Sequence, residues 1–346
     1  MNHYPSNVKE KLNSIILSMA EHHWLFSKNP GHDFTRQHLG KLFFYDTMRL
    51  IISMGKGSTN DEIMDYFDLD PDLIPSQSAF CQRRRQISLS AFEYLFSEFS
   101  SSFPSTMDKF KDHCILACDG CHVVYATNSD IIEDYNKPRL IDYKGYNHMH
   151  LNGFVDVISK AFLDVVIQPG QQPDEREALH SMLDHFTPDD PQKYIITADR
   201  GYESYDLLFH CELKNLGYVF RVKSPSSPKS ILSYYASELP DDLEEFDVTI
   251  KRFFTDKATN IMKSQSDVYR YINPSKNTPH FYELLRKNHS HLYFLQFRVV
   301  KIKTAGISKT GNLFPPDSVQ FQHFYRKRSG RRKPEKETGW QQQVSL

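Results

Sequence analysis

Two short segments of the chain share one pattern, in which an apolar run is followed by an aspartate and a glycine that is typical of a turn. The first is Ile115-Leu-Ala-Cys-Asp-Gly120, and the second is Tyr194-Ile-Ile-Thr-Ala-Asp-Arg-Gly-Tyr202. Each apolar run is typical of a buried strand. Carboxylates at neighbouring strand ends can share a divalent metal ion, because hard oxygen ligands suit Mg²⁺. Asp119 and Asp199 are therefore the candidate catalytic and metal-binding residues.

A pair of metal ions would give these aspartates a role in phosphodiester chemistry. Two Mg²⁺ ions about 4 Å apart can activate the attacking oxygen and neutralise the leaving oxygen. We expect two Mg²⁺ ions as the cofactor, with Mn²⁺ able to substitute. A third carboxylate normally completes such a site. An Asp-Gly pair alone is weak evidence, since it is also common in ordinary turns.

The elements that must position the two aspartates alternate between strand and helix from residue 113 onward. We predict strands over 115–118, 122–126 and a hairpin over 154–167, then helix 174–186, strand 194–198, helix 205–216 and strand 218–222. This order, β-β-β-α-β-α-β, matches a ribonuclease H-like core. In that core the first and fourth strands are neighbours, which brings Asp119 and Asp199 together.

Residues 1–112 are predicted to be helical. Thr59-Asn-Asp-Glu62 has the form of a capping box that opens a short helix through Phe67. A second helix begins within Pro75–Ile87, with Ser76 or Ser78 as its cap, and carries Arg83, Arg84 and Arg85. Two such helices can bind DNA as a helix-turn-helix. An amphipathic bundle with a solvated basic face fits the same pattern.

The distribution of charge and of turn-forming residues suggests where this region ends and where DNA could bind. Ser97–Ser105, rich in serine and broken by Pro104, is predicted to be a domain linker. The formal net charge is −1, but Gln296–Leu346 carries 11 Lys and Arg against 3 Asp and Glu. Such a basic segment is compatible with phosphate contacts or with a solvated tail.

Composition indicates an ordinary globular protein of the cytoplasm. Apolar residues make up 39% and charged residues 25%, and no apolar run is long enough to span a bilayer. The N-terminus lacks a secretory pattern. Five cysteines fit reduced thiols, although Cys118 and Cys121 have the spacing of half a zinc site without a second ligand pair. We expect no membrane partner.

Four motifs occur together and in order, and they resemble those of bacterial insertion-sequence transposases. They are Asp119-Gly120, Tyr146-Asn-His-Met-His-Leu-Asn-Gly-Phe-Val-Asp156, Asp199-Arg-Gly-Tyr202 and Phe220-Arg-Val-Lys223. The chain is similar to the cut-and-paste DDE group, which has a Tyr-x2-Arg-x3-Glu-x6-Lys signature near the third acid. The likeness runs from about residue 35 to about residue 328.

This resemblance implies an α/β fold in four parts. A helical DNA-binding domain spans 1–112, the first part of a ribonuclease H-like catalytic core of mixed sheet flanked by helices spans 113–223, a β-rich insertion spans 224–310, and the incomplete end of the core with a basic tail spans 311–346. The alternating Phe246–Ile250 and the strand-forming Tyr293–Ile302 suit the insertion. Such enzymes act as homodimers that bring two transposon ends to a target DNA.

The family signature fails at the third acid. Tyr325 and Arg328 reproduce the Tyr-x2-Arg element, but Arg332 stands where the glutamate is expected and Gly339 where the lysine is expected. Glu335 and Glu337 are nearby, yet Pro334 would interrupt the helix that must aim them. A reading-frame shift between Arg328 and Arg331 is one hypothesis for this loss.

The predicted function is a DNA transposase that performs Mg²⁺-dependent cleavage and strand transfer, impaired by the missing acid. Two alternatives remain open: an inactive DNA-binding relic that competes with an intact transposase, and a Mg²⁺-dependent nuclease without strand transfer. The predicted DNA-binding residues are Arg83, Arg84, Arg85, Arg200, Lys223, Tyr325 and Arg328. His148 and His150 are expected at the surface, with little weight as DNA contacts.

Overall fold

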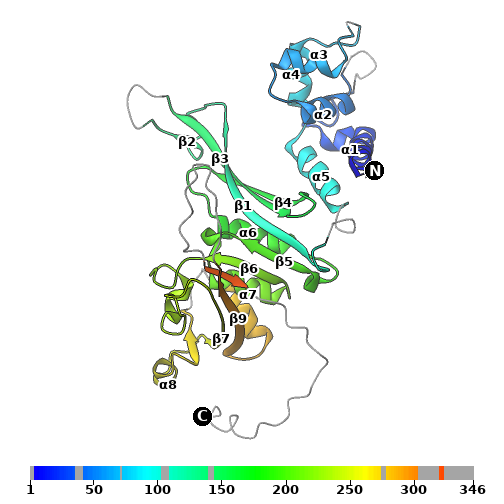
Figure 1. Ribbon diagram of the computed structural model, residues 1–346. Helices are drawn as coiled ribbons and strands as arrows, with labels where there is room; N and C mark the ends of the chain where they lie inside the picture. Colours follow the sequence, from blue (N-terminus) through cyan, green and yellow to red (C-terminus); the bar gives the residue numbers. More distant parts are fainter. Residues whose placement is uncertain are drawn as a thin grey trace. The chain divides into compact units, whose positions relative to one another are not determined.

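The computed structural model describes residues 4–35, 42–70, 72–102, 109–138, 144–273, 278–302 and 319–322 (Figure 1). The chain divides into two compact units. The helical unit comprises Met1–Asp108 with Ser159–Asp164, and the sheet unit comprises Lys109–Ile158 with Val165–Leu346. Each unit is described below by itself.

The described residues of the helical unit form five α-helices. They are α1 (Tyr4–Glu21), α2 (Phe44–Ser53), α3 (Thr59–Tyr66), α4 (Gln77–Gln86) and α5 (Leu89–Ser101), with a 3₁₀ turn, η1 (His23–Phe26), after α1. Apolar residues at helical spacing in α1, including Ile15, Ile16 and Met19, pack against Met48 of α2 and Leu95 of α5. This contact confirms the helical periodicity expected from the sequence.

The two short helices of the predicted DNA-binding motif are present, with one change in capping. Ser58, not Thr59, is the N-cap of α3, and its Oγ accepts from Asp61 N at 3.2 Å. Glu62 instead accepts from the backbone nitrogens of Gly55 and Gly57. Ser76 caps α4 as predicted. Ten residues separate α3 from α4, more than the three or four of a typical helix-turn-helix.

The predicted linker over Ser97–Ser105 is wrong for its first part. Helix α5 continues through Ser101, and Ser100 is buried. Serine is a weak helix former only where its side chain competes for backbone groups. The apolar pattern of Leu95 and Phe99, which pack into the core of the helical unit, decides the local structure here. Residues 103–108 lie outside the described part of the chain.

In the first part of the sheet unit, the helix-strand-helix-strand order after residue 174 is as predicted, but the strands before it differ, since 115–126 form one strand and the strand at 135–136 was not predicted. This part contains β1 (Cys114–Tyr125), β2 (Tyr135–Asn136), β3 (Tyr146–Asp156), β4 (Phe162–Pro169), α6 (Glu175–His185), β5 (Tyr194–Ala198), α7 (Tyr205–Leu213) and β6 (Gly217–Val222). Strands β3 and β4 pair as the predicted hairpin. Strands β1, β5 and β6 are parallel neighbours, which confirms the ribonuclease H-like arrangement.

Strand β1 differs from its prediction. The sequence suggested two strands separated by a turn at Asp119-Gly120, but one twelve-residue strand runs through both positions. Its first five residues pair with β5 in parallel, and residues from Leu116 onward pair with β3 in antiparallel fashion. A Cβ at Gly120 would lie 2.4 Å from His150 Nε2. Glycine is thus needed for the close approach of a side chain from β3, not for a turn.

The second part of the sheet unit extends the same sheet. It contains β7 (Phe246–Thr255), α8 (Asn260–Ser264), β8 (Tyr269–Tyr271), α9 (Pro279–Lys287), β9 (Leu292–Lys301) and β10 (Val319–Gln322). The described strands follow the order β2-β3-β1-β5-β6-β10-β9-β7-β8. Strand β10 lies between β6 and β9 and is antiparallel to both. The two strands predicted in the insertion, at Phe246–Ile250 and Tyr293–Ile302, are therefore confirmed as β7 and β9.

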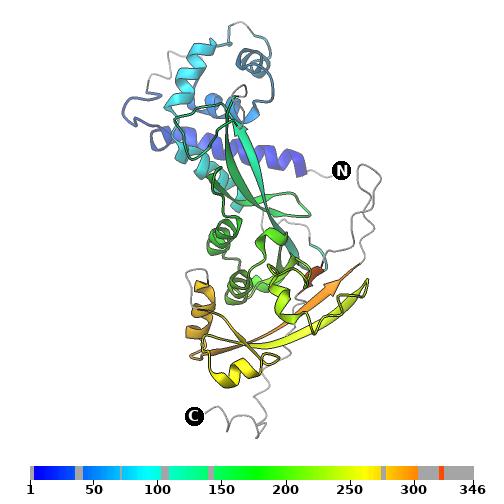
Figure 2. The same ribbon diagram turned by 90° about the vertical axis from the view of Figure 1, so that its left-hand side faces the viewer.

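Three helices form a row along one side of this sheet, α6 beside α7 and α7 beside α9 (Figure 2). Helix α9 and strands β7 and β9 pack with α7 around an apolar core that includes Phe209, Phe254, Phe281 and Phe297. Within the residues that the structure describes, none of the helices combines the length and apolarity needed to cross a membrane.

Candidate active site

The pairing of β1 with β5 brings the two candidate aspartates to adjacent positions. Cys118 and Ala198 are the last partners in the parallel register, and Asp119 and Asp199 each follow directly. Adjacent strands are about 4.8 Å apart, and residues at equivalent positions point to the same face. Eighty residues apart in sequence, the two aspartates therefore follow neighbouring positions at the end of the β1–β5 pairing.

Asp119 lies where β1 leaves one partner and continues along the other. Its parallel pairing with β5 stops at Cys118, while antiparallel pairing with β3 places Asp119 opposite Gly153. Its Oδ1 accepts a hydrogen bond from Gly120 N at 2.9 Å, and the residue is exposed. The carboxylate is thus open to solvent at the divergence of two strands, a position that the sequence had assigned to a strand end.

Asp199 directly follows β5 and caps the 3₁₀ turn η5 (Arg200–Tyr202). Its Oδ1 accepts from Arg200 N at 2.7 Å and lies 3.5 Å from Arg221 Nη1. Arg221 reaches it because Ala198 pairs with Phe220, which leaves the next residue on each strand side by side. Sequence reasoning missed Arg221, although its place one residue after Phe220 in the fourth motif could have indicated it.

Glu175, at the first position of α6, is a further carboxylate near Gly201 and His150. Its Oε1 lies 3.5 Å from His150 Nε2, and its Oε2 would lie 2.8 Å from a Cβ on Gly201, two residues after Asp199. His150 in turn adjoins Gly120, next to Asp119. Sequence reasoning missed Glu175, because helix α6 carries several acidic residues and only the fold distinguishes this one.

Histidines from β1 and β3 form a cluster beside Glu175. His122 lies opposite His150 in the register, and its ring centroid is 4.8 Å from that of His150 and 4.6 Å from that of His148. Burial, followed by the neighbouring histidines, lowers the pKa of His122. His148 and His150 are both buried, so the expectation that they lie at the surface is wrong. Their alternation within β3 places them on its covered face.

The cysteines near the site do not form a metal-binding pair. Cys118 is buried and Cys121 is exposed, three positions further along the same strand. Side chains at odd separations in a strand point to opposite faces, so the two sulfur atoms diverge. Burial raises the pKa of the Cys118 thiol to about 12, which keeps the thiol protonated at neutral pH.

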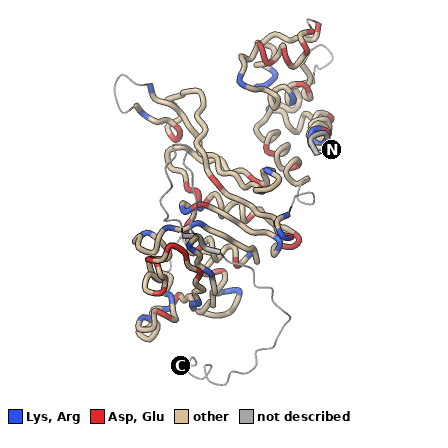
Figure 3. The backbone as a smooth tube through the Cα atoms, in the orientation of Figure 1, with Lys and Arg blue, Asp and Glu red and all other residues tan. Residues whose placement is uncertain are grey.

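The predicted DNA-binding residues of the sheet unit differ in their surroundings. Arg200 is exposed beside Asp199. Lys223 is partly exposed, and its Nζ lies 3.4 Å from Oε2 of the buried Glu203, so it also balances an internal charge. Tyr325 and Arg328, like Arg332 and the two glutamates near the C-terminus, lie outside the described residues. Basic and acidic residues are interspersed along the described backbone (Figure 3).

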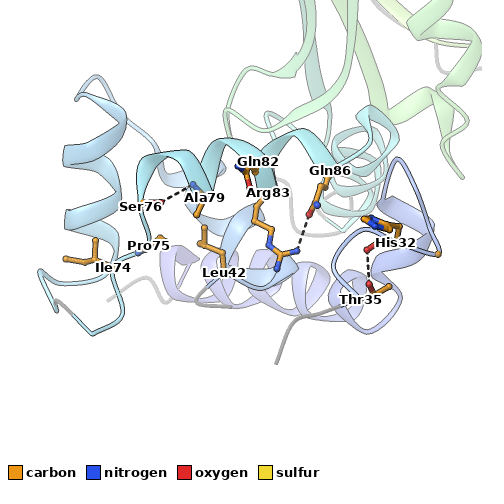
Figure 4. A pocket seen from close by; sticks show the side chains of 11 residues that line it. His32, Thr35, Leu42, Ile74, Pro75, Ser76, Ala79, Gln82, Arg83 and Gln86 are labelled. Carbon is orange, nitrogen blue, oxygen red and sulfur yellow. Dashed lines mark hydrogen bonds between the residues drawn. The ribbon is translucent and has the colours of Figure 1, made fainter. Parts of the chain in front are cut away.

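The arginine cluster of α4 belongs to the helical unit. Arg84 and Arg85 are exposed, whereas Arg83 is half-buried, with its guanidinium 5.1 Å from the ring centroid of Phe34. Arg83 also donates to Gln86 Oε1 at 3.2 Å. Both side chains line a cavity of about 840 Å³ between α4 and the segment around His32 (Figure 4). Arg83 is therefore held by packing, while its two neighbours remain open to a partner.

Asp119 and Asp199 together form what we call the carboxylate edge, and its chemistry fits a divalent metal. Asp119 and Asp199 offer hard oxygen atoms that face solvent, the ligand type that Mg²⁺ prefers. The buried His150 has no hydrogen-bond partner on either ring nitrogen, while its Nε2 faces Glu175. An unsatisfied polar group of this kind commonly marks a site built for something besides packing.

The described sheet, with two acids at the meeting point of parallel strands, defines a ribonuclease H-like α/β protein. A family model described as the transposase DDE domain matches residues 110–330, and the chain belongs to this family. DDE transposases typically use divalent metals. No curated protein matches the chain.

Among solved structures, the chain matches the cryo-EM structure of a piggyBac transposase synaptic complex with hairpin DNA. The sequence identity is 9% and the TM-score is 0.35. The match covers 84% of the present chain and 59% of that chain. The chain thus spans less than two thirds of the length of this transposase.

Proposed function

We propose that this protein cleaves DNA phosphodiesters and transfers the strand, using divalent metal held by Asp119 and Asp199. One observation supports the proposal: Asp119 and Asp199, both exposed, directly follow the last paired positions of β1 and β5, within a chain of the DDE transposase family. Mg²⁺, with Mn²⁺ as a substitute, would stabilise the charge on the attacking and leaving oxygens.

The protein's own residues prepare this edge in three ways. Backbone nitrogens of Gly120 and Arg200 hold the two carboxylates by hydrogen bonds. Arg221 places a positive charge beside Asp199, which steadies the carboxylate and offers a contact for a phosphate oxygen. Arg200 is exposed at the same edge and supplies a second guanidinium for the DNA backbone.

The DNA partner would be the transposon end and the target. Residues 1–112 are the proposed DNA-binding domain, in which the exposed Arg84 and Arg85 of α4 are the phosphate contacts, with Arg83 fixed behind them. Lys223, Tyr325 and Arg328 remain proposed contacts of the catalytic domain. A homodimer that holds two ends is the proposed active assembly.

Activity is proposed to be low, because Arg332 occupies the position of the family glutamate. Glu175 is the described carboxylate that also reaches this edge, through its approach to His150 and Gly201. We propose that Glu175 supplies part of the negative charge that the missing family glutamate would have given to the metal site. Full strand transfer would then be slower than single-strand nicking.

The test uses purified full-length protein, DNA carrying the element's own terminal repeats, and Mg²⁺ or Mn²⁺. Metal-dependent nicking followed by joined product is expected, and both should disappear in Asp119→Asn and Asp199→Asn. Nicking without joining would indicate the nuclease alternative. Binding to the ends without metal-dependent cleavage would contradict the proposal and favour a DNA-binding relic.

A further inference from the structure

A second cluster of polar groups lies in the helix row of the sheet unit. His180 of α6, His210 of α7 and His280 of α9 each offer a ring nitrogen, and these atoms lie within 4.8 Å of one another. The three rings are stacked, with centroids 3.8 Å apart for His210 and His280 and 4.4 Å apart for His180 and His280. The cluster joins three helices that are far apart in sequence.

The cluster is enclosed by the protein. The His210 side chain is 2% exposed, and those of His180 and His280 are 13% and 14% exposed. Three stacked imidazoles are an expensive way to fill an interior, since each ring brings two polar nitrogens that need partners. An apolar residue would fill the same space without that cost.

Two aspartates lie beside the rings of the cluster. Asp206 Oδ2 lies 2.7 Å from His280 Nδ1 and 3.6 Å from His180 Nε2. Asp184 Oδ1 lies 3.2 Å from His210 Nε2. The hydrogen bond between His280 and Asp206 favours the proton on His280 Nδ1, which leaves Nε2 of that ring with a lone pair.

Two of the ring nitrogens face each other. His180 Nδ1 and His210 Nδ1 are 2.9 Å apart, and which of them donates depends on the tautomers of the two rings. When both rings carry their proton on Nε2, both Nδ1 atoms offer a lone pair, and a cation can satisfy them. A metal ion satisfies both nitrogens at once, and His280 lies against the same two rings.

We propose that His180, His210 and His280 bind one Zn²⁺ ion. Neutral imidazoles are preferred ligands of Zn²⁺, at about 2.0–2.1 Å, which corresponds to ligand atoms about 3.3 Å apart in a tetrahedron. The ligand nitrogens already lie within 4.8 Å of one another, and the stacked rings must turn about their side-chain torsions to direct their in-plane lone pairs at one ion. The ligand type also distinguishes the two sites, because imidazole nitrogens suit Zn²⁺ whereas the oxygen ligands of the carboxylate edge suit Mg²⁺.

Asp206 would fix the geometry of this site. It is buried, and its Oδ1 accepts from the backbone nitrogens of His280 and Phe281, at 3.1 and 3.2 Å. A carboxylate that is itself held and that orients a ligating histidine is the common support of zinc sites. The ion would tie α9 to α6 and α7, and so fasten the second part of the sheet unit to the first.

The test begins with tag-free, full-length protein that has been stripped with EDTA and dialysed. Zn²⁺ is titrated in competition with a chromophoric chelator, and Co²⁺ is added separately to record its visible spectrum. We expect one tight equivalent of Zn²⁺, a tetrahedral Co²⁺ spectrum and a melting temperature raised by about 5 °C. Absence of a tight equivalent in the wild-type protein would overturn the proposal.

Variants locate the ion. His180→Gln and His280→Gln should each lose the tight equivalent, whereas His289→Asn, an exposed histidine beyond α9, should keep it. Asp184→Asn, at an exposed position, should weaken Zn²⁺ binding about tenfold even if the histidine variants fold poorly. Tight binding that survives both His→Gln changes would refute the assignment.

A further control separates this proposal from the proposed function. The double variant Asp119→Asn and Asp199→Asn should lose DNA cleavage and retain the tight Zn²⁺ equivalent and its Co²⁺ spectrum. Loss of Zn²⁺ binding in that double variant would place the ion at the carboxylate edge and contradict the proposal. If the double variant keeps the tight Zn²⁺ equivalent while neither the wild type nor any variant cleaves DNA, the zinc site is supported and only the catalytic assignment is contradicted.

Discussion

The carboxylate edge and the histidine cluster are two groups of polar side chains in one sheet unit, and they differ in exposure and in ligand type. Asp119 and Asp199 are exposed, and the carboxylate of each accepts one hydrogen bond from a backbone nitrogen. The three histidines are enclosed, and they lie beside the buried Asp206 and the exposed Asp184. An open set of oxygens leaves room for substrate, whereas an enclosed set of nitrogens contributes to stability. This difference agrees with the proposed catalytic role of the edge and the proposed stabilising role of the histidine cluster.

The largest expected effect is on catalysis at the edge. Asp119→Asn should lower metal-dependent nicking of end DNA by about 10³-fold or more, because a neutral amide cannot replace an anionic metal ligand. The melting temperature should change little, since the side chain is exposed. Gel-based nicking assays and thermal melts measure both. Wild-type cleavage by Asp119→Asn would show that the edge is not the active site.

A smaller catalytic effect is expected at the neighbouring acid. Glu175→Gln should reduce nicking by about 10–100-fold, the range typical of a carboxylate that supports a metal site. Glu177→Gln is the matched control, because it is an exposed glutamate in the same helical turn. Initial rates at several Mg²⁺ concentrations should show a raised metal requirement for Glu175→Gln alone. Equal rates for the two variants would remove Glu175 from the site.

The histidine cluster should make stability depend on pH when metal is removed by a chelator. Burial, followed by the neighbouring His280, lowers the pKa of His180 to about 4, and burial with the same neighbour lowers that of His210 to about 2. Lys214 also lowers the pKa of His210, while Asp206 and Asp184 act in the opposite direction on His180. Both rings are therefore neutral when folded and bind protons near pH 6.5 when unfolded.

The sign of the effect follows from this difference. Stability is fully present above pH 6.5 and falls by about 1.4 kcal/mol per pH unit for each ring as the pH drops toward 4. Urea unfolding at pH 7.5, 6.0 and 5.0 measures the slope. His180→Gln should reduce that slope by about half, and an unchanged slope would exclude His180 as a source.

A backbone change at the edge should have the smallest effect. Gly120→Ala should destabilise the protein by about 1–3 kcal/mol, because the new Cβ would displace the buried His150. The comparison is Gly31→Ala, where a Cβ meets nothing within 4 Å. Chemical denaturation of both variants gives the difference. Equal stability would mean that β3 can yield at this point.

Much of the sheet unit could be predicted from its sequence, because local apolar runs decide its strands. The run before Asp199 predicted β5 with its observed limits, and the alternation around Phe246 predicted β7. The prediction for β1 was wrong in one respect: it placed a turn at Asp119-Gly120. An Asp-Gly pair indicates a turn only when no partner strand continues past it. Strand β3 does continue, and its pairing overrides the local preference.

The candidate site could be predicted only in part. Aspartates after strands are visible in a sequence, so Asp119 and Asp199 were found. Glu175, Arg221 and the three clustered histidines were missed, because each depends on a contact between elements whose relative placement the sequence does not give. The linker was misplaced for a related reason, since packing of α5 outweighed its serines.

Strand β10 has a consequence for the order in which the protein can mature during synthesis. It fills the place between β6 and β9, yet its four residues follow the end of β6 by nearly a hundred positions. Until the ribosome has released that stretch, β6 and β9 each present an unpaired border able to recruit another chain. A nascent protein stalled before residue 319 would therefore be prone to self-association, and a late-acting chaperone would have most to protect during this interval.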